Sequence, residues 1–182
     1  MRDLSLHILD IAQNSLSAGA TTVTLTLSLR REENLLSLEI ADDGRGMDRE
    51  TLEKVTDPFV TSRTTRKVGL GLPLLSAAAE RSGGSMRIES SPGEGTTVSA
   101  DFEYDNIDRA PVGDLAATLI SLIAVNPDVR FVVRYDVDGK EYVFDTREVV
   151  EELGGVPINN PLVIEWIRRH LDEGIRDAGT ID

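Results

Sequence analysis

Two acidic residues and two glycines follow an apolar stretch near residue 40, in the order Ile40-Ala41-Asp42-Asp43-Gly44-Arg45-Gly46-Met47. Glycine adopts positive φ angles and has no Cβ, so Gly44 and Gly46 would let the chain turn and let a ligand approach the backbone. The carboxylate of Asp42, at the end of a strand, can accept a hydrogen bond from one specific donor, and losing such a bond costs about 1.5 to 3 kcal/mol. These residue types indicate a site for a small ligand.

Three other interpretations compete for the same residues. A calcium-binding loop needs oxygen ligands at its third and fifth positions, where Gly44 and Gly46 stand, so this class is excluded. A dinucleotide-binding fingerprint has a different glycine spacing. An ordinary acidic turn between a strand and a helix remains open, because Asp and Gly are common turn residues.

A polar stripe lies on the helix that precedes this stretch. Apolar residues recur at helical spacing over residues 4–18, and Gly19 is placed to end the helix. Asp10, Asn14 and Ser17 stand at i, i+4 and i+7, so they share one face. A solvated face is the ordinary explanation, although no long charged side chain follows Asp10.

A second glycine-rich stretch, Gly69-Leu70-Gly71-Leu72, opens a helix that we expect to run to Ser82. Free amides and the positive end of the helix dipole suit phosphate oxygens there. The Rossmann alternative needs a strand directly before the glycines, but the polar, basic segment 57–67 precedes them and is typical of a mobile loop. A Walker-type Gly-Lys-Ser/Thr loop does not occur in the sequence.

The elements that must position these residues follow from the hydrophobic pattern. Alternating residues predict an antiparallel pair at 22–29 and 36–40, and a second hairpin at 86–89 and 97–102. A short helix is expected at 49–55. We therefore predict an α/β fold in which helices cover one face of a sheet of at least four strands.

Composition excludes several classes of protein and site. The 182 residues carry a formal net charge of −13, which disfavours nucleic-acid and membrane partners because both are anionic. The absence of cysteine excludes disulfides and thiolate chemistry. With no signal peptide and no apolar span of 18 residues, we expect a cytoplasmic protein.

Five segments occur in the order and spacing of a known family. The sequence DIAQNSLSAGA resembles that family's N box, DDGRGM its first glycine box, DPFVTSR the segment before its lid, GLGL its second glycine box and GEGTTV its third. Over residues 1–106 the chain resembles the ATP-binding domain of sensor histidine kinases, type II topoisomerases, mismatch-repair ATPases and heat-shock chaperones, and it is most similar to the histidine kinases. The resemblance implies a two-layer sandwich of helices on a mixed sheet.

The resemblance also implies roles for single residues. Asp42 would bond the adenine amino group, Thr96 would support that contact through water, and Asn14 would coordinate Mg²⁺. Arg63 matches a basic lid position near the phosphates. The remaining residues that the resemblance places around ATP are Ser17, Gly44, Gly46, Met47, Ser62, Gly69, Leu70, Gly71 and Leu72.

Two departures from the family bear on activity. Hydrolysing members often carry a glutamate four residues before the metal asparagine, where this chain has the shorter Asp10, the candidate catalytic residue. We therefore expect weak or no intrinsic ATP hydrolysis. Sensor kinases also carry a helical pair with the phosphorylated histidine, whereas this sequence begins at the N box. His7 and His170 are the only histidines, and neither precedes the acidic residue usual beside a phosphoacceptor.

Two functions follow from these departures. The first is a stand-alone protein kinase that transfers phosphate from Mg-ATP to a separate protein. The alternative is a non-catalytic regulatory subunit that ATP switches between binding states. A DNA-linked ATPase is disfavoured by the charge.

Residues 109–182 differ in composition from the first part. The pattern predicts a helix from Pro111, a hairpin around Asp138-Gly139 and two further helices, and five of the eight aromatic residues lie between Phe131 and Trp166. We expect a small α+β domain, helix-hairpin-helix in order, with a core of its own or a docking surface for a partner or a second copy of the chain. Its deletion is expected to leave nucleotide binding intact.

Overall fold

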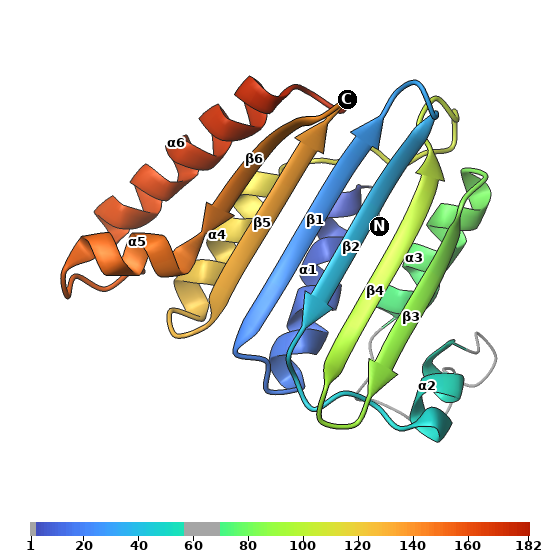
Figure 1. Ribbon diagram of the computed structural model, residues 1–182, viewed down its shortest axis with the longest axis horizontal. Helices are drawn as coiled ribbons and strands as arrows, with labels where there is room; N and C mark the ends of the chain where they lie inside the picture. Colours follow the sequence, from blue (N-terminus) through green and yellow to red (C-terminus); the bar gives the residue numbers. More distant parts are fainter. Residues whose placement is uncertain (1–2, 57–69) are drawn as a thin grey trace.

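The computed structural model describes residues 3–56 and 70–182, which contain one six-stranded sheet (Figure 1). Across the sheet the strand order is β3-β4-β2-β1-β5-β6. The strands are β1 (Thr22–Arg30), β2 (Leu35–Asp42), β3 (Ser85–Ser91), β4 (Gly95–Glu103), β5 (Arg130–Val137) and β6 (Lys140–Asp145). β1 is antiparallel to β2 and parallel to β5, so the sheet is mixed, as predicted.

Helices cover one face of this sheet and leave the other open (Figure 1). The covering helices are α1 (Leu4–Ser17), α3 (Gly71–Arg81), α4 (Leu115–Val125) and α6 (Pro161–Ala178). The two shorter helices are α2 (Arg49–Thr56), which follows β2, and α5 (Thr146–Leu153), which follows β6. The arrangement confirms the predicted two-layer α/β sandwich. In the described ranges, no helix combines the length and the apolar character that a membrane crossing requires.

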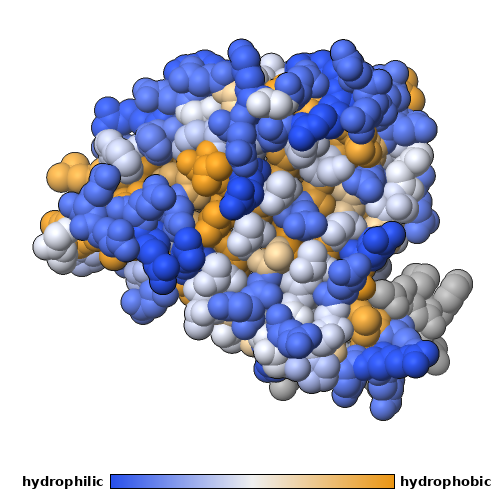
Figure 2. Space-filling view, in the orientation of Figure 1, coloured by the Kyte–Doolittle hydropathy of each residue, from blue (hydrophilic) through white to orange (hydrophobic). Residues whose placement is uncertain are grey.

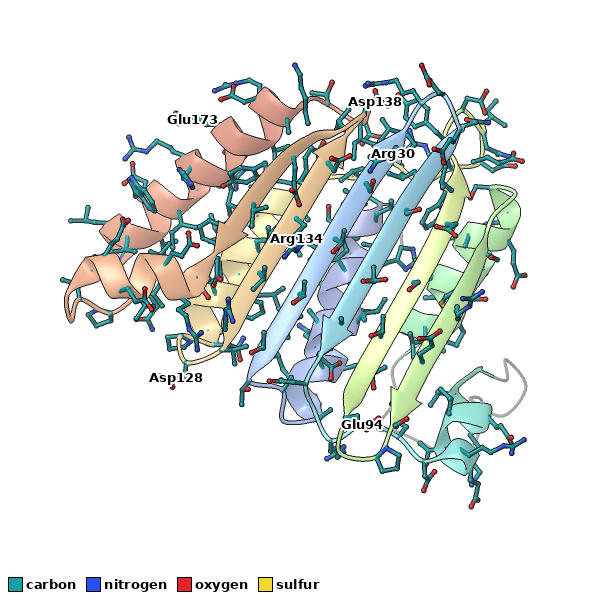
Figure 3. All side chains as sticks on the ribbon, viewed as in Figure 1. Arg30, Glu94, Asp128, Arg134, Asp138 and Glu173 are labelled. Carbon is teal, nitrogen blue, oxygen red and sulfur yellow. The ribbon has the colours of Figure 1, made fainter. Side chains whose placement is uncertain are left out.

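Strand alternation decides which face is covered. Leu25, Leu27 and Leu29 of β1 are buried under the helices, whereas the small polar residues between them lie half-exposed on the open face. That face is largely hydrophilic or neutral over the middle of the sheet (Figure 2), and Arg134 stands on it (Figure 3). The open face therefore needs no second layer of helices.

Residues 109–182 form no separate core. Their strand β5 pairs with β1 from Thr22↔Arg130 to Leu29↔Val137, and their buried residues belong to the same hydrophobic cluster as those of the first part. Phe131, Tyr135 and Phe144 are each at most 3% exposed. Three of the five aromatic residues of this region thus fill the shared core, whereas Trp166 is 44% exposed. The expectation of a separate core is corrected. The predicted order of helix, hairpin and helices is confirmed.

The connection between the two parts is tied to α1. The backbone amides of Leu4 and Ser5 donate to the carbonyl oxygens of Pro111 and Val112, at 2.8 and 2.9 Å. α4 starts later than the predicted Pro111. The side chain of Asp114 accepts a hydrogen bond from the Ala117 amide at 2.8 Å. This cap begins the helix at Leu115.

Candidate functional site

A cavity of about 520 Å³ lies where α1, the end of β2, α2, α3 and the β3–β4 turn meet. Its size is that of a small-molecule site. Residues predicted from the sequence supply Asn14, Ser17, Asp42, Gly46, Met47, Leu72 and Thr96. The lining residues that sequence reasoning missed are Ile11, Ser15, Ala18, Arg45, Asp48, Thr51, Pro92 and Val98.

Asp42 is the best-defined polar group of this cavity. Its Oδ2 accepts a hydrogen bond from Ser15 Oγ at 2.6 Å, and its Oδ1 accepts one from the Gly44 amide at 2.8 Å. Two donors from different segments therefore fix the carboxylate at the end of β2. Each carboxylate oxygen can accept more than one hydrogen bond, so a ligand donor can still be received.

The adjacent Asp43 has a different partner set. It accepts hydrogen bonds from the Thr21 amide, the Thr21 hydroxyl and the Thr22 amide at 2.7, 2.6 and 2.8 Å. Burial alone would raise the pKa of Asp43, but these hydrogen bonds outweigh it and lower the pKa below its ordinary value. Asp43 thus ties the turn to the start of β1.

Two glycines let the turns at the cavity pack backbone against backbone. Gly46 has φ +65°, and a Cβ there would lie 1.9 Å from the carbonyl oxygen of Ser91. Gly95 has φ +93°, and its Cβ would lie 1.9 Å from the carbonyl oxygen of Asp42. Any other residue would clash and be strained at either position. Gly44 is buried behind Asp42 and does not line the cavity.

A hydroxyl pair joins the loop after β2 to β4. Ser90 Oγ accepts from the Met47 amide at 2.8 Å, lies 2.8 Å from Thr96 Oγ1 and donates to the Gly95 carbonyl at 3.0 Å. Thr96 stands opposite Asp42 in the strand register. The predicted residues Asp42 and Thr96 are therefore brought together, and Ser90 is the partner that the sequence did not indicate.

The polar stripe of α1 divides between the cavity and α3. Asn14 and Ser17 line the cavity. The side-chain amide of Asn14 makes no hydrogen bond with another described residue. Asp10 does not line it. A Cβ on Gly71 would lie 2.9 Å from Asp10 Cβ and 3.2 Å from its Oδ2, so Asp10 packs against the start of α3.

The phosphate-binding residues predicted from the second glycine-rich stretch are placed in part. Leu72 lines the cavity in the first turn of α3, Gly71 begins that helix and Leu70 precedes it. Ser62, Arg63 and Gly69, together with the whole of the predicted loop 57–67, fall in 57–69, outside the described residues.

The donor set around the cavity fits a nucleotide more than a free metal. Residues 3–56 and 70–182 contain no cluster of three His, Cys, Asp or Glu side chains that could hold an ion. Mg²⁺ bound with a nucleotide takes phosphate and water oxygens and needs one or two protein ligands. The unpaired amide of Asn14 can supply one such oxygen.

One of the missed residues, Ser15, could have been predicted from its place in the sequence pattern. Ser15 stands on the apolar line of α1 with Ile8 and Ile11, is 3% exposed and bonds Asp42. A small hydroxyl on an apolar helical stripe needs a buried acceptor. The other missed residues have no such pattern, since turn geometry brings Arg45 and Pro92 to the cavity.

Comparison with known proteins shows the family to which this chain belongs. The sequence pattern of the family described as "Histidine kinase-, DNA gyrase B-, and HSP90-like ATPase" matches residues 2–106. Histidine protein kinase DivJ of Caulobacter vibrioides is 34% identical over 102 residues, which cover 54% of this chain and 17% of that protein. Sensor histidine kinase WalK of Bacillus subtilis is 33% identical over 111 residues, 57% of this chain and 18% of that protein. The chain thus spans less than a fifth of these relatives.

One solved structure resembles most of the fold. The N-terminal domain of a DNA repair protein superposes with a TM-score of 0.50 at 16% identity, covering 79% of this chain and 52% of that chain. At this identity the likeness concerns the fold alone. The family match rests on the sequence of the segment that forms the cavity: the chain belongs to the histidine kinase-, DNA gyrase B- and HSP90-like ATPases, and residues 2–106 are its ATP-binding domain.

Proposed function

We propose that this chain binds Mg-ATP in the cavity and transfers the terminal phosphoryl group to a separate protein. The observation that carries the nucleotide assignment is Asp42, fixed by Ser15 and Gly44 and facing a cavity of nucleotide size. In this proposal Asp42 accepts a hydrogen bond from the adenine amino group and Asn14 supplies an oxygen to Mg²⁺. The amides at the start of α3 receive phosphate oxygens.

The positions of the two histidines support an acceptor outside the chain. His7 is 2% exposed, within α1. His170 lies on α6 and stacks on Trp166, with 4.9 Å between ring centroids. α6 packs at the β6 edge, and β1 and β5 separate that edge from the strands of the cavity (Figure 1). Neither histidine is therefore presented to the cavity within one molecule.

Asp10 is the candidate base in this proposal. It lies one helical turn before Asn14 and against the first residue of α3, the end of the helix expected to hold the phosphates. A general base must come within about 2.6 to 3.2 Å of the proton that it accepts. Because Asp10 does not line the cavity, we expect the isolated chain to hydrolyse ATP slowly or not at all.

The same observation favours a second candidate function. The carboxylates that line the cavity in the described residues are Asp42 and Asp48, and Asp48 already accepts a hydrogen bond from the Thr51 amide at 2.8 Å. A site with adenine and metal contacts but no placed base suits a regulatory subunit that ATP switches between binding states.

Radiolabelled ATP separates the two functions. Wild-type chain and Asp10→Asn are each incubated with γ-labelled ATP and candidate acceptor proteins, and nucleotide affinity is measured in parallel. A kinase labels an acceptor only with the wild type, while Asp10→Asn keeps Mg-ATP affinity within about threefold. Gln13→Ala, an exposed change on the same helix, is the control and should leave both unchanged.

Three results would contradict the kinase proposal or its base. Fast phosphate release by the isolated wild type would show that the chain hydrolyses ATP without a partner. Equal labelling by Asp10→Asn would remove its catalytic role. Nucleotide-dependent association with an acceptor that never becomes labelled would instead establish the regulatory function.

A further inference from the structure

Arg45 is the one basic side chain among the described residues that line the cavity. It is exposed, and its guanidinium makes no ion pair or hydrogen bond with another described residue. Most other arginines of the described chain are paired, for example Arg30 with Asp136, Arg109 with Asp182 and Arg130 with Asp145. An unpaired guanidinium at the rim of a ligand site is free to contact the ligand.

The backbone of Arg45 is fixed on both sides. Its amide donates to the carbonyl oxygen of Ala18 at 3.0 Å, at the end of α1, and its carbonyl accepts from the Gly93 amide at 2.7 Å, in the β3–β4 turn. The neighbouring Gly46 packs against Ser91, whose carbonyl oxygen leaves no room for a Cβ at Gly46. The side chain of Arg45 therefore starts three residues after Asp42, beside Ala18 at the end of α1. The start of α3 packs against Asp10, eight residues earlier on α1.

This position matches the base of a nucleotide rather than its phosphates. The inner wall of the cavity includes the apolar residues Ile11, Met47 and Val98. A planar base that bonds Asp42 can place one face on such a wall, which leaves its other face towards the rim. A guanidinium is planar and weakly hydrated, and it stacks on aromatic rings and on nucleic-acid bases.

We propose that Arg45 is a base-recognition residue, whose guanidinium lies on the exposed face of the purine ring held by Asp42. The inference rests on the proposed nucleotide site and assigns to Arg45 the preference for an aromatic base over a bare polyphosphate. Arg45 then contributes through planarity as well as charge, so lysine cannot replace it.

Affinities of three ligands test this assignment. Adenosine, ADP and tripolyphosphate are titrated into the wild type, Arg45→Ala, Arg45→Lys and the control Arg49→Ala, at two salt concentrations, by calorimetry or by NMR. Arg49 carries the same charge on α2, is paired with Glu53 and does not line the cavity. Matching melting temperatures establish that the variants are folded.

The expected result is a loss of roughly three- to tenfold for both adenosine and ADP in Arg45→Ala, by the same factor and at both salt concentrations. Arg45→Lys should lose nearly as much, and Arg49→Ala should retain wild-type affinity. A loss confined to ADP and tripolyphosphate, or one that disappears at high salt, would make Arg45 a phosphate contact and overturn the inference. Unchanged affinity in Arg45→Ala would overturn it too. A wild type that binds neither adenosine nor ADP would refute the nucleotide site itself.

Discussion

The two ends of the sheet consist of similar alternating strands but use their loops in opposite ways. Where β2 and β4 meet α1, glycines with positive φ bring turns together around a cavity, and the Asp42 oxygens and the Asn14 amide can still accept a ligand. At the β5–β6 end, Asp145 accepts from the Arg147 amide and pairs with Arg130, and Asn160 accepts from the Leu162 amide.

Packing also differs between the two ends, because the β6 edge is filled where the ligand end has a cavity. At the β6 edge, Gly174 of α6 lies against the Tyr142 ring, where a Cβ would come within 2.1 Å, and Trp166, His170 and Phe144 form contacting rings. The β5–β6 end therefore satisfies its polar groups internally and fills its space. The comparison teaches that one continuous core supports a region built for a ligand and a region built for stability.

The largest expected effect comes from a core residue at the β5–β6 end. Phe131 is 2% exposed, so Phe131→Ala should lower the free energy of unfolding by about 3 to 5 kcal/mol. Because the core is shared, both ends should unfold together. Denaturant unfolding followed by fluorescence of Trp166, the single tryptophan, and by loss of ADP binding tests this. Thr24→Ala on the open face is the control, within about 0.5 kcal/mol. Two separate transitions would show two independent cores.

The second effect concerns the ligand end alone. Asp42→Asn can turn an amide donor towards the adenine amino group, and an unpaired buried donor costs about 1 to 3 kcal/mol, or roughly 5- to 150-fold in affinity. Calorimetry with ADP measures this loss. Equal affinity of the variant and the wild type would refute the adenine assignment.

A third change, at the β5–β6 end, should lower stability and leave ligand affinity unchanged. Asp145→Ala removes the cap of α5 and the partner of Arg130, and we expect a loss of about 1 to 2 kcal/mol in stability with unchanged ADP affinity. The hydrogen bond from Arg130 lowers the pKa of Asp145 against the opposing effect of burial. The wild type should therefore keep this contribution above the ordinary pKa of 3.8 and lose it as the pH falls through the lowered value. Reduced ADP affinity in Asp145→Ala would show that the β5–β6 end also affects nucleotide binding, against the expected separation.

The smallest expected effect is a pH dependence of stability that comes from His7 on α1. Burial lowers the pKa of His7, which is 2% exposed and whose Nδ1 has no hydrogen-bond partner among residues 3–56 and 70–182. A lowered pKa in the folded state gives stability that is present above the ordinary value of 6.5 and is lost as the pH falls through the lowered pKa. We expect His7→Gln to flatten the wild-type decrease in unfolding free energy between pH 7.5 and 5.5 by at most about 1.4 kcal/mol, the limit that the ordinary pKa of 6.5 sets over this range. Parallel urea titrations at both pH values measure it, and identical decreases would exclude His7 as the cause.

Sequence patterns predicted the fold where local signals were strong. The Thr/Leu alternation of β1, the glycine after α1 and the Asp138-Gly139 turn each specify a local structure through one short-range cause. Pairing of β5 with β1 has no such local signal, because it joins segments far apart in the sequence. That is why residues 109–182 were expected to have a core of their own.

The candidate site was predictable to the extent that residue type implied chemistry. The role of Asp42 could be inferred from its residue type and place, those of Asn14 and Thr96 came from the family resemblance, and all three line one cavity. Gly95 and Ser90 could not be inferred in the same way, because their roles depend on how closely two turns approach in space. Arg45 resembled any exposed arginine until its backbone was located between α1 and the β3–β4 turn.

The parallel pairing of β1 with β5 has a consequence for synthesis of the chain. Until β5 has left the ribosome, the outer edge of β1 presents unpaired amides and carbonyls along an alternating Thr/Leu strand, which is a template for aggregation. The β5–β6 hairpin therefore covers the outer edge of β1 only after the other four strands have been made. Deletion of residues 109–182 was first expected to leave nucleotide binding intact. Because it uncovers this edge of β1, it should instead give a fragment that self-associates.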